Sequence, residues 1–167
     1  MKARKRKSKT RRARLLENAV LGLRHLGFEF YQYASDFTKI SDSPLFLPKR
    51  YLRCNYPHPP LYGTKGFKEG YIFDSGTEYI LEVKYQNSSG STDEKVPYIW
   101  EHFLVSPIPN WIVWFDGAWW LNNRRGREAV QWLRERSIQA PVGRHLYVCA
   151  TNDEWFDLTN RLFNSKD

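Results

Sequence analysis

The sequence predicts an α/β protein in which a mixed central β-sheet is flanked by helices and preceded by a disordered basic arm. Three observations predict this fold class. Helical and strand-like segments alternate along the chain, two neighbouring β-rich runs form a hairpin, and basic residues crowd the start. A length of 167 residues with 41% hydrophobic residues fits one domain with a real core. We therefore expect residues 1–14 to form the arm and residues 15–167 the domain.

The arm carries the positive charge of the chain. Residues 2–14 contain nine basic side chains and no acid, while the whole chain has a formal net charge of +8, which leaves the rest at −1. A dense run of like charge does not pack, but it suits contact with phosphates, here through Lys5, Arg6, Arg11 and Arg12. A solubility tail, a targeting signal or a ribosomal type of RNA contact would share this composition.

The first half of the domain shows a helix, a strand and an irregular stretch. Apolar residues recur at helical spacing over residues 16–26, and Gly27 is a natural stop. Residues 28–34 alternate as a short strand. Residues 41–66 are rich in proline and lack a clear period, so we expect a long irregular segment that touches a ligand.

The second half alternates helices and strands. Residues 91–94 have the spacing of a capping box, with a helix behind them whose buried stripe is Val96, Ile99 or Trp100, Phe103 and Leu104. Strands are expected at residues 110–117 and 145–151, a helix at 126–136, and a last helix at 152–163 capped by Asn152 or Asp153.

Cellular location follows from what the chain lacks. Cys54 and Cys149 form neither a disulfide framework nor a metal-knuckle spacing, which favours a reducing compartment. No apolar run is long enough to span a bilayer, and none follows the basic start as in a signal peptide. We expect a cytoplasmic protein that does not contact a membrane.

The predicted hairpin of residues 70–74 and 79–86 brings polar groups together. Alternation places Glu82 and Lys84 on one face of the second strand. With Ser75 and Gly76 at the tip, residues whose numbers sum to 151 face each other, so Glu69 lies opposite Glu82, about 5 Å away at Cβ. A register slip of one residue would move Glu69 away.

These groups suit the hydrolysis of a phosphodiester. Two close carboxylates repel each other, and Mg²⁺ relieves the repulsion while it shares substrate phosphate oxygens. A lysine beside the metal orients or deprotonates a water and stabilises charge on the phosphate. Glu-x-Lys is also common on strands whose charges merely face solvent, so the triplet alone does not decide the function.

A longer string makes the interpretation specific. Residues 69–103, "EGYIFDSGTEYILEVKYQNSSGSTDEKVPYIWEHF", resemble the core of PD-(D/E)XK nucleases, especially the small phage and mobile-element type. The similarity extends more loosely to "WIVWFDG" and "GREAVQWL". The resemblance implies a restriction-endonuclease-like core, dependence on Mg²⁺ or Mn²⁺, and DNA cleavage.

The resemblance also assigns roles to single residues. Glu82 matches the second acidic metal ligand and Lys84 the catalytic lysine. Glu69 falls at the first acidic position, where the family usually has Asp, and Gln86 matches a polar residue that lines the site. The backbone carbonyl of Val83 would complete the metal ligands.

Two further acids are alternatives in this assignment. Glu17 matches an acid that some relatives supply from the first helix, although an exposed helix glutamate explains it equally well. Asp74 is a rival first acid, but it lies at the hairpin tip, away from Glu82.

Contacts with DNA are expected outside the hairpin as well. Lys95, Arg124 and Arg125 are candidates for phosphate contacts. Trp119 is a candidate for stacking on bases or wedging into a groove of the duplex. His58 and His102 show no ligand spacing and receive no role.

The predicted function is a Mg²⁺-dependent DNA endonuclease used in restriction, homing or phage DNA processing. It would act as a homodimer, because paired active sites cut both strands. Two alternatives remain: a catalytically inactive nucleic-acid-binding protein with a nuclease-like fold, and an RNA-binding or assembly protein that works through the arm and the Trp-rich loop.

Overall fold

A six-stranded mixed sheet forms the centre of the molecule. The computed structural model describes residues 11–31, 50–59, 66–87 and 95–164. The strands lie side by side in chain order: β1 (Glu29–Tyr31), β2 (Arg50–His58), β3 (Gly66–Asp74), β4 (Thr77–Tyr85), β5 (Asn110–Asp116) and β6 (His145–Cys149). The pairs β2–β3 and β3–β4 are antiparallel, whereas the pairs β1–β2, β4–β5 and β5–β6 are parallel. The predicted mixed sheet flanked by helices is confirmed.

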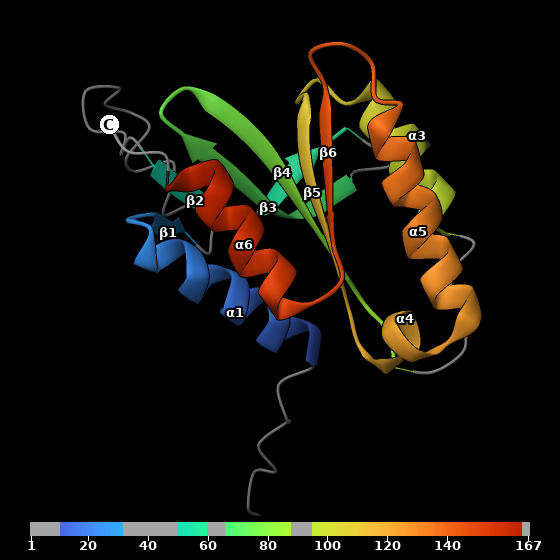
Figure 1. Cartoon of the computed structure of the whole chain (residues 1–167). Helices are drawn as coiled ribbons and strands as arrows, with labels where there is room; N and C mark the ends of the chain where they lie inside the picture. Colours follow the sequence, from blue (N-terminus) through green and yellow to red (C-terminus); the bar gives the residue numbers. More distant parts are fainter. Residues whose placement is uncertain (1–10, 32–49, 60–65, 88–94, 165–167) are drawn as a thin grey trace, which may run out of the picture.

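Helices cover both faces of this sheet (Figure 1). On one face α1 (Arg11–His25) and α6 (Asn152–Phe163) lie side by side. On the other face lie α3 (Val96–Val105), α4 (Ala118–Asn122) and α5 (Arg124–Ile138). Each face has its own hydrophobic core, and alternate residues of the strands supply the two cores.

β5 shows how the sequence specifies a central strand. Its continuous apolar run, Trp111 to Phe115, is 0% exposed because helices cover both faces. The stripe predicted for α3 is confirmed in part: Val96, Ile99, Trp100 and Phe103 are buried.

The hairpin of β3 and β4 has the predicted register. Gly70 pairs with Leu81 and Asp74 with Thr77, so paired residue numbers sum to 151. Ser75 (φ 48°) and Gly76 (φ 101°) form the tip, since a two-residue hairpin turn of this twist needs positive φ at both positions.

The irregular segment predicted for residues 41–66 is wrong in its second half. β2 occupies Arg50–His58, and β3 begins at Gly66. Proline argued against a strand, yet Pro57 fits because the described pairing of β1 covers only Tyr51 to Arg53 of β2, and proline is tolerated where a strand has a free edge.

Other element boundaries differ from the prediction. α1 begins at Arg11, inside the range predicted for the arm, and residues 1–10 lie outside the described residues. The capping box of residues 91–94 also lies outside them. Thr151, rather than Asn152 or Asp153, caps α6 by accepting a hydrogen bond from the Glu154 backbone N–H (3.1 Å).

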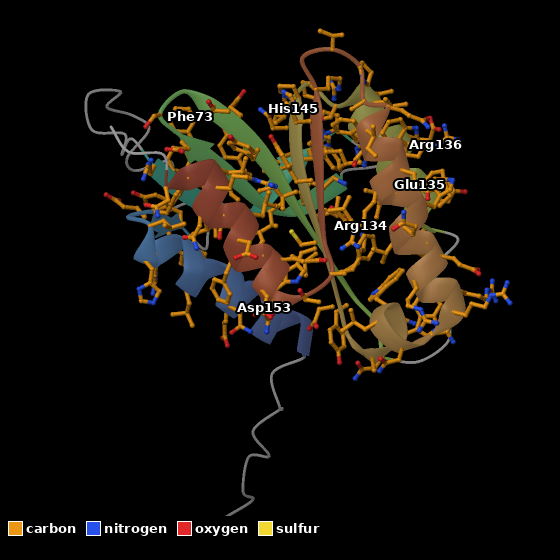
Figure 2. All side chains as sticks on the ribbon, viewed as in Figure 1. Phe73, Arg134, Glu135, Arg136, His145 and Asp153 are labelled. Carbon is orange, nitrogen blue, oxygen red and sulfur yellow. The ribbon has the colours of Figure 1, made fainter. Side chains whose placement is uncertain are left out.

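The two helical layers meet across β6, the last strand of the sheet. Arg134 reaches from α5 toward α6 (Figure 2), and its Nη2 lies 2.7 Å from Glu154 Oε2.

Cys54 and Cys149 are buried free thiols. Among the described residues, no helix combines the length and apolar character needed to cross a bilayer.

Candidate active site

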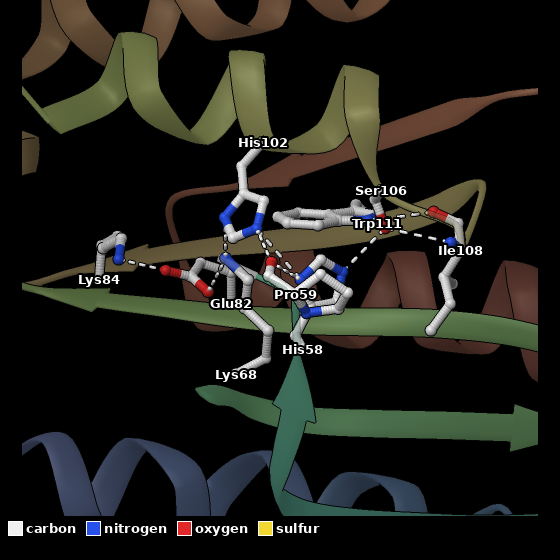
Figure 3. A network of polar contacts seen from close by, with 9 residues as sticks. All are labelled: His58, Pro59, Lys68, Glu82, Lys84, His102, Ser106, Ile108 and Trp111. Atoms are coloured by element: carbon white, nitrogen blue, oxygen red, sulfur yellow. Dashed lines mark hydrogen bonds and ion pairs between the residues drawn. The ribbon is translucent and has the colours of Figure 1, made fainter. Parts of the chain in front are cut away.

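Glu82 and Lys84 meet on the face of the sheet that α3 covers. On β4 they alternate with Leu81 and Val83, which pack into the core on the α1 and α6 side. The Lys84 ammonium donates a hydrogen bond to Glu82 Oε1 (Figure 3). Glu82 is only 6% exposed, so its charge depends on the cations beside it. The predicted pairing of these two residues on one face is therefore present.

Lys68 is a second ammonium beside the same carboxylate, and the sequence reasoning missed it. Lys68 Nζ lies 3.1 Å from Glu82 Oε2 and 4.4 Å from the centre of the Trp111 ring, and the residue is 7% exposed. Strict alternation from Gly70 would place Lys68 on the face opposite Glu82. Pairing of β3 with β4 ends at Gly70, and Lys68 pairs only with Tyr56 of β2, so the register with β4 does not fix the position of its long side chain.

Two histidines extend the site into a partly buried polar network (Figure 3). His102 on α3 contacts Lys68 through Nδ1 (3.1 Å) and the Pro59 carbonyl through Nε2 (2.6 Å). His58 contacts the same carbonyl through Nδ1 (2.9 Å) and Ser106 Oγ through Nε2 (2.9 Å). These histidines are 44 residues apart in sequence, so their spacing gave no signal.

Burial and charge shift the pKa values of this network. Burial alone would raise the pKa of Glu82, but the positive charges of Lys84 and Lys68 outweigh it and lower that pKa. Burial lowers the pKa of Lys68, opposed by attraction to Glu82. Burial also lowers the pKa of His102, and that of His58 to about 4. The carboxylate is charged at neutral pH, and both imidazoles are neutral.

The other predicted catalytic positions lie on the same two strands or directly after them. Glu69 belongs to β3 next to Lys68, but its side chain lies outside the described residues. Gln86 directly follows β4, where its backbone N–H donates to the Asp116 carbonyl (2.9 Å) and its carbonyl accepts from Trp119 N–H (3.2 Å). The Val83 backbone lies between Glu82 and Lys84.

The two alternative acids lie apart from Glu82. Glu17 is exposed on α1, and the buried side of that helix packs on the opposite face of the sheet. Asp74 is at the hairpin tip and forms an ion pair with Arg50 (Nε to Oδ1, 2.7 Å).

Some predicted DNA contacts are exposed, whereas one is buried. Lys95, Arg124 and Arg125 are exposed, at the starts of α3 and α5. Trp119 is 5% exposed and packs edge-on against Trp120, so it belongs to the hydrophobic core and presents no open ring face for the expected contact with bases. Arg11 and Arg12 belong to α1, but their side chains lie outside the described residues. Lys5 and Arg6 lie outside the described residues altogether.

Glu82 offers donor chemistry that suits a hard divalent cation. Its Oε2 is buried and lies at ion-pair distance from Lys68, yet it accepts no hydrogen bond of good geometry from the described residues. A carboxylate oxygen with a spare lone pair is a preferred ligand of Mg²⁺. Among the described residues no group of three or more acidic, histidine or cysteine side chains forms a metal cluster.

Comparison with protein families matches most of the chain. Residues 10–162 match the model of the PD-(D/E)XK nuclease superfamily domain, and this range contains all of β1 to β6. A search of curated proteins and a search of solved structures found no match.

Proposed function

The chain belongs to the PD-(D/E)XK nuclease superfamily, and we propose on this premise that it is a Mg²⁺-dependent endonuclease that hydrolyses phosphodiester bonds in DNA. The contact of the Lys84 ammonium with the buried Glu82 carboxylate carries the proposal. This contact brings together, on one face of the sheet, a carboxylate that can bind a cation and an ammonium that can donate hydrogen bonds.

Each residue of the proposed site has a distinct role. Glu82 and Glu69, with the Val83 carbonyl, would hold the cation, which supplies positive charge to the phosphate and acidifies a bound water when present. Lys84 orients the attacking water and stabilises the negative charge that develops on the phosphate. Gln86 lines the same end of β4.

Basic residues around this end of the sheet support an approach by DNA. The Trp119 backbone N–H donates a hydrogen bond to the Gln86 carbonyl and so joins α4 to the end of β4. Arg124 and Arg125 follow α4 at the start of α5. α3 connects the parallel strands β4 and β5, so the helix begins near the end of β4. The exposed Lys95, which directly precedes α3, therefore lies at the same end of the sheet. These cations would bind phosphates, with the N-terminal basic segment adding affinity of no sequence preference.

The biological setting is part of the proposal. A homodimer would place two active sites on opposite strands, and a role in restriction, homing or the processing of phage or mobile-element DNA would place the protein with DNA in the cytoplasm. The mass of the protein in solution, with and without a DNA duplex, tests the homodimer.

Cleavage of a supercoiled plasmid tests the activity. We expect the chain to nick or linearise the plasmid with Mg²⁺ or Mn²⁺ and not with EDTA. Lys84→Ala and Glu82→Gln should each slow cleavage by about 10²–10³-fold, because each removes charge stabilisation at the reacting phosphate. Arg136→Ala is the control, since Arg136 lies on the outer side of α5 (Figure 2).

Three outcomes would contradict the proposal. Undiminished cutting by Lys84→Ala would remove the site. Salt-sensitive DNA binding without cleavage in any divalent metal would favour the non-catalytic nucleic-acid-binding protein. Stronger competition by RNA than by duplex DNA would point to RNA as the ligand.

A further inference from the structure

We propose that Lys68 is a second lysine of the active site, which positions the Glu82 carboxylate and fills the place beside Oε2 that a second divalent cation would need. The inference rests on the proposed function, because it concerns the same carboxylate. It implies that the reaction proceeds with a single cation per chain.

The Lys68 ammonium is held from three directions. Glu82 Oε2 lies 3.1 Å from Nζ, His102 Nδ1 also lies at 3.1 Å, and the Trp111 ring centre lies at 4.4 Å. Trp111 is fully buried in β5, and its Nε1 donates to the Ile108 carbonyl, so the ring cannot move aside. A lysine fixed in this way is a built part of the site.

The contacts of His102 keep Lys68 as a donor. The Pro59 carbonyl can only accept a hydrogen bond, and it lies 2.6 Å from His102 Nε2, so this nitrogen carries the proton of the neutral ring. His102 Nδ1 is then an acceptor, and Lys68 donates to it (3.1 Å). On the other side of His102, His58 contacts the same carbonyl through Nδ1 (2.9 Å) and Ser106 Oγ through Nε2 (2.9 Å).

Charge around the carboxylate then limits the number of cations. Glu82 carries one negative charge and already contacts the two ammonium groups of Lys84 and Lys68. A divalent cation that reaches Oε2 from the Lys68 side would meet an ammonium at contact distance in a buried setting, where repulsion is poorly screened. A second cation at Oε2 is therefore disfavoured as long as Lys68 is charged.

Binding of Mn²⁺ to the full chain, measured by titration calorimetry and by electron paramagnetic resonance, tests the proposal without DNA. We expect the wild type to bind one Mn²⁺ per chain that Glu82→Gln abolishes. Lys68→Met and Lys68→Gln remove the charge, so they should tighten Mn²⁺ binding by about tenfold or admit a second ion. Both should also slow plasmid cleavage, because Glu82 loses its positioning group. Lys68→Arg, which keeps the charge, should bind Mn²⁺ as the wild type does.

Two results would overturn the proposal. One is a wild type that binds two Mn²⁺ ions dependent on Glu82, a measurement that needs no variant to fold. The other is unchanged or weaker Mn²⁺ binding by the folded, uncharged Lys68 variants, as a purely structural lysine would give. Cleavage of DNA that depends on Lys84 in the same preparations would leave the proposed function intact. Tighter Mn²⁺ binding without any cleavage would leave the role of Lys68 intact and remove the nuclease activity.

Discussion

His58 makes the stability of the fold depend on pH. The residue is 3% exposed, and burial lowers its pKa to about 4 in the folded chain. The unfolded chain takes up a proton on this side chain near pH 6.5, whereas the folded chain does so only near pH 4, so acidification through this window favours unfolding. From pH 7.5 to pH 5 we expect a loss of about 2 kcal/mol in the free energy of unfolding from His58, measured by urea denaturation.

A histidine outside the network provides the comparison. His58→Asn should unfold more easily at pH 7.5 yet lose much of the difference between the two pH values. His145→Asn, at an exposed position on β6, should keep the wild-type difference. An equal pH dependence in the wild type and His58→Asn would contradict the assignment.

At the scale of single residues, the sequence predicts contacts within a strand better than contacts between distant segments. Glu82 and Lys84 are two positions apart, so alternation alone places them on one face. Lys68 was missed because it lies beyond the part of β3 that pairs with β4, where alternation in the hairpin no longer says which side chains face Glu82. His58 and His102 come together only because β2 ends beneath α3, which no spacing encodes.

Gly117 fixes how the end of β4 meets α4. Its φ of 109° is in the region that favours glycine, and an added Cβ would collide with the backbone carbonyl oxygen of Gln86. That carbonyl accepts the hydrogen bond from Trp119 N–H. We expect Gly117→Ala to lower the free energy of unfolding by about 2–5 kcal/mol, from unfavourable φ and overpacking combined.

Gly76 separates the two causes in the same urea experiment. It has a similar φ of 101°, but an added Cβ would meet nothing within 4 Å. Gly76→Ala should therefore cost only about 1–2 kcal/mol, from the backbone conformation alone. Equal losses in the two variants would show that the close approach to Gln86 is unimportant.

Strongly patterned elements were predictable, and elements stabilised by their neighbours were not. The apolar run of β5 and the alternation of β4 need no context to be recognised. β2 carries Pro57 and alternates poorly, and it becomes a strand because β3 pairs along its length. α4 spans only Ala118–Asn122, too short for a helical period, and it depends on the burial of Trp119 and Trp120.

The two hydrophobic cores lie in one part of the chain, and most of the excess positive charge lies in another. Both hydrophobic clusters are built from residues between Ala19 and Phe163, a region that holds the proposed catalytic groups. Outside residues 2–14 the chain has a formal net charge of −1, so its body has little long-range attraction for a polyanion. Affinity for DNA should thus depend on the N-terminal segment, while catalysis depends on the body.

Removal of residues 1–10 tests this division, because it deletes six basic side chains: Lys2, Arg4, Lys5, Arg6, Lys7 and Lys9. If all six contact duplex phosphates, the slope of log Kobs against log salt concentration should become shallower by about 5. DNA binding at low salt should weaken, while the thermal midpoint stays unchanged because both cores remain. A full-length variant with glutamine at the six positions should behave in the same way, since charge rather than length is the cause. An unchanged slope in both variants would place the phosphate contacts on the body, at positions such as Arg124 and Lys95.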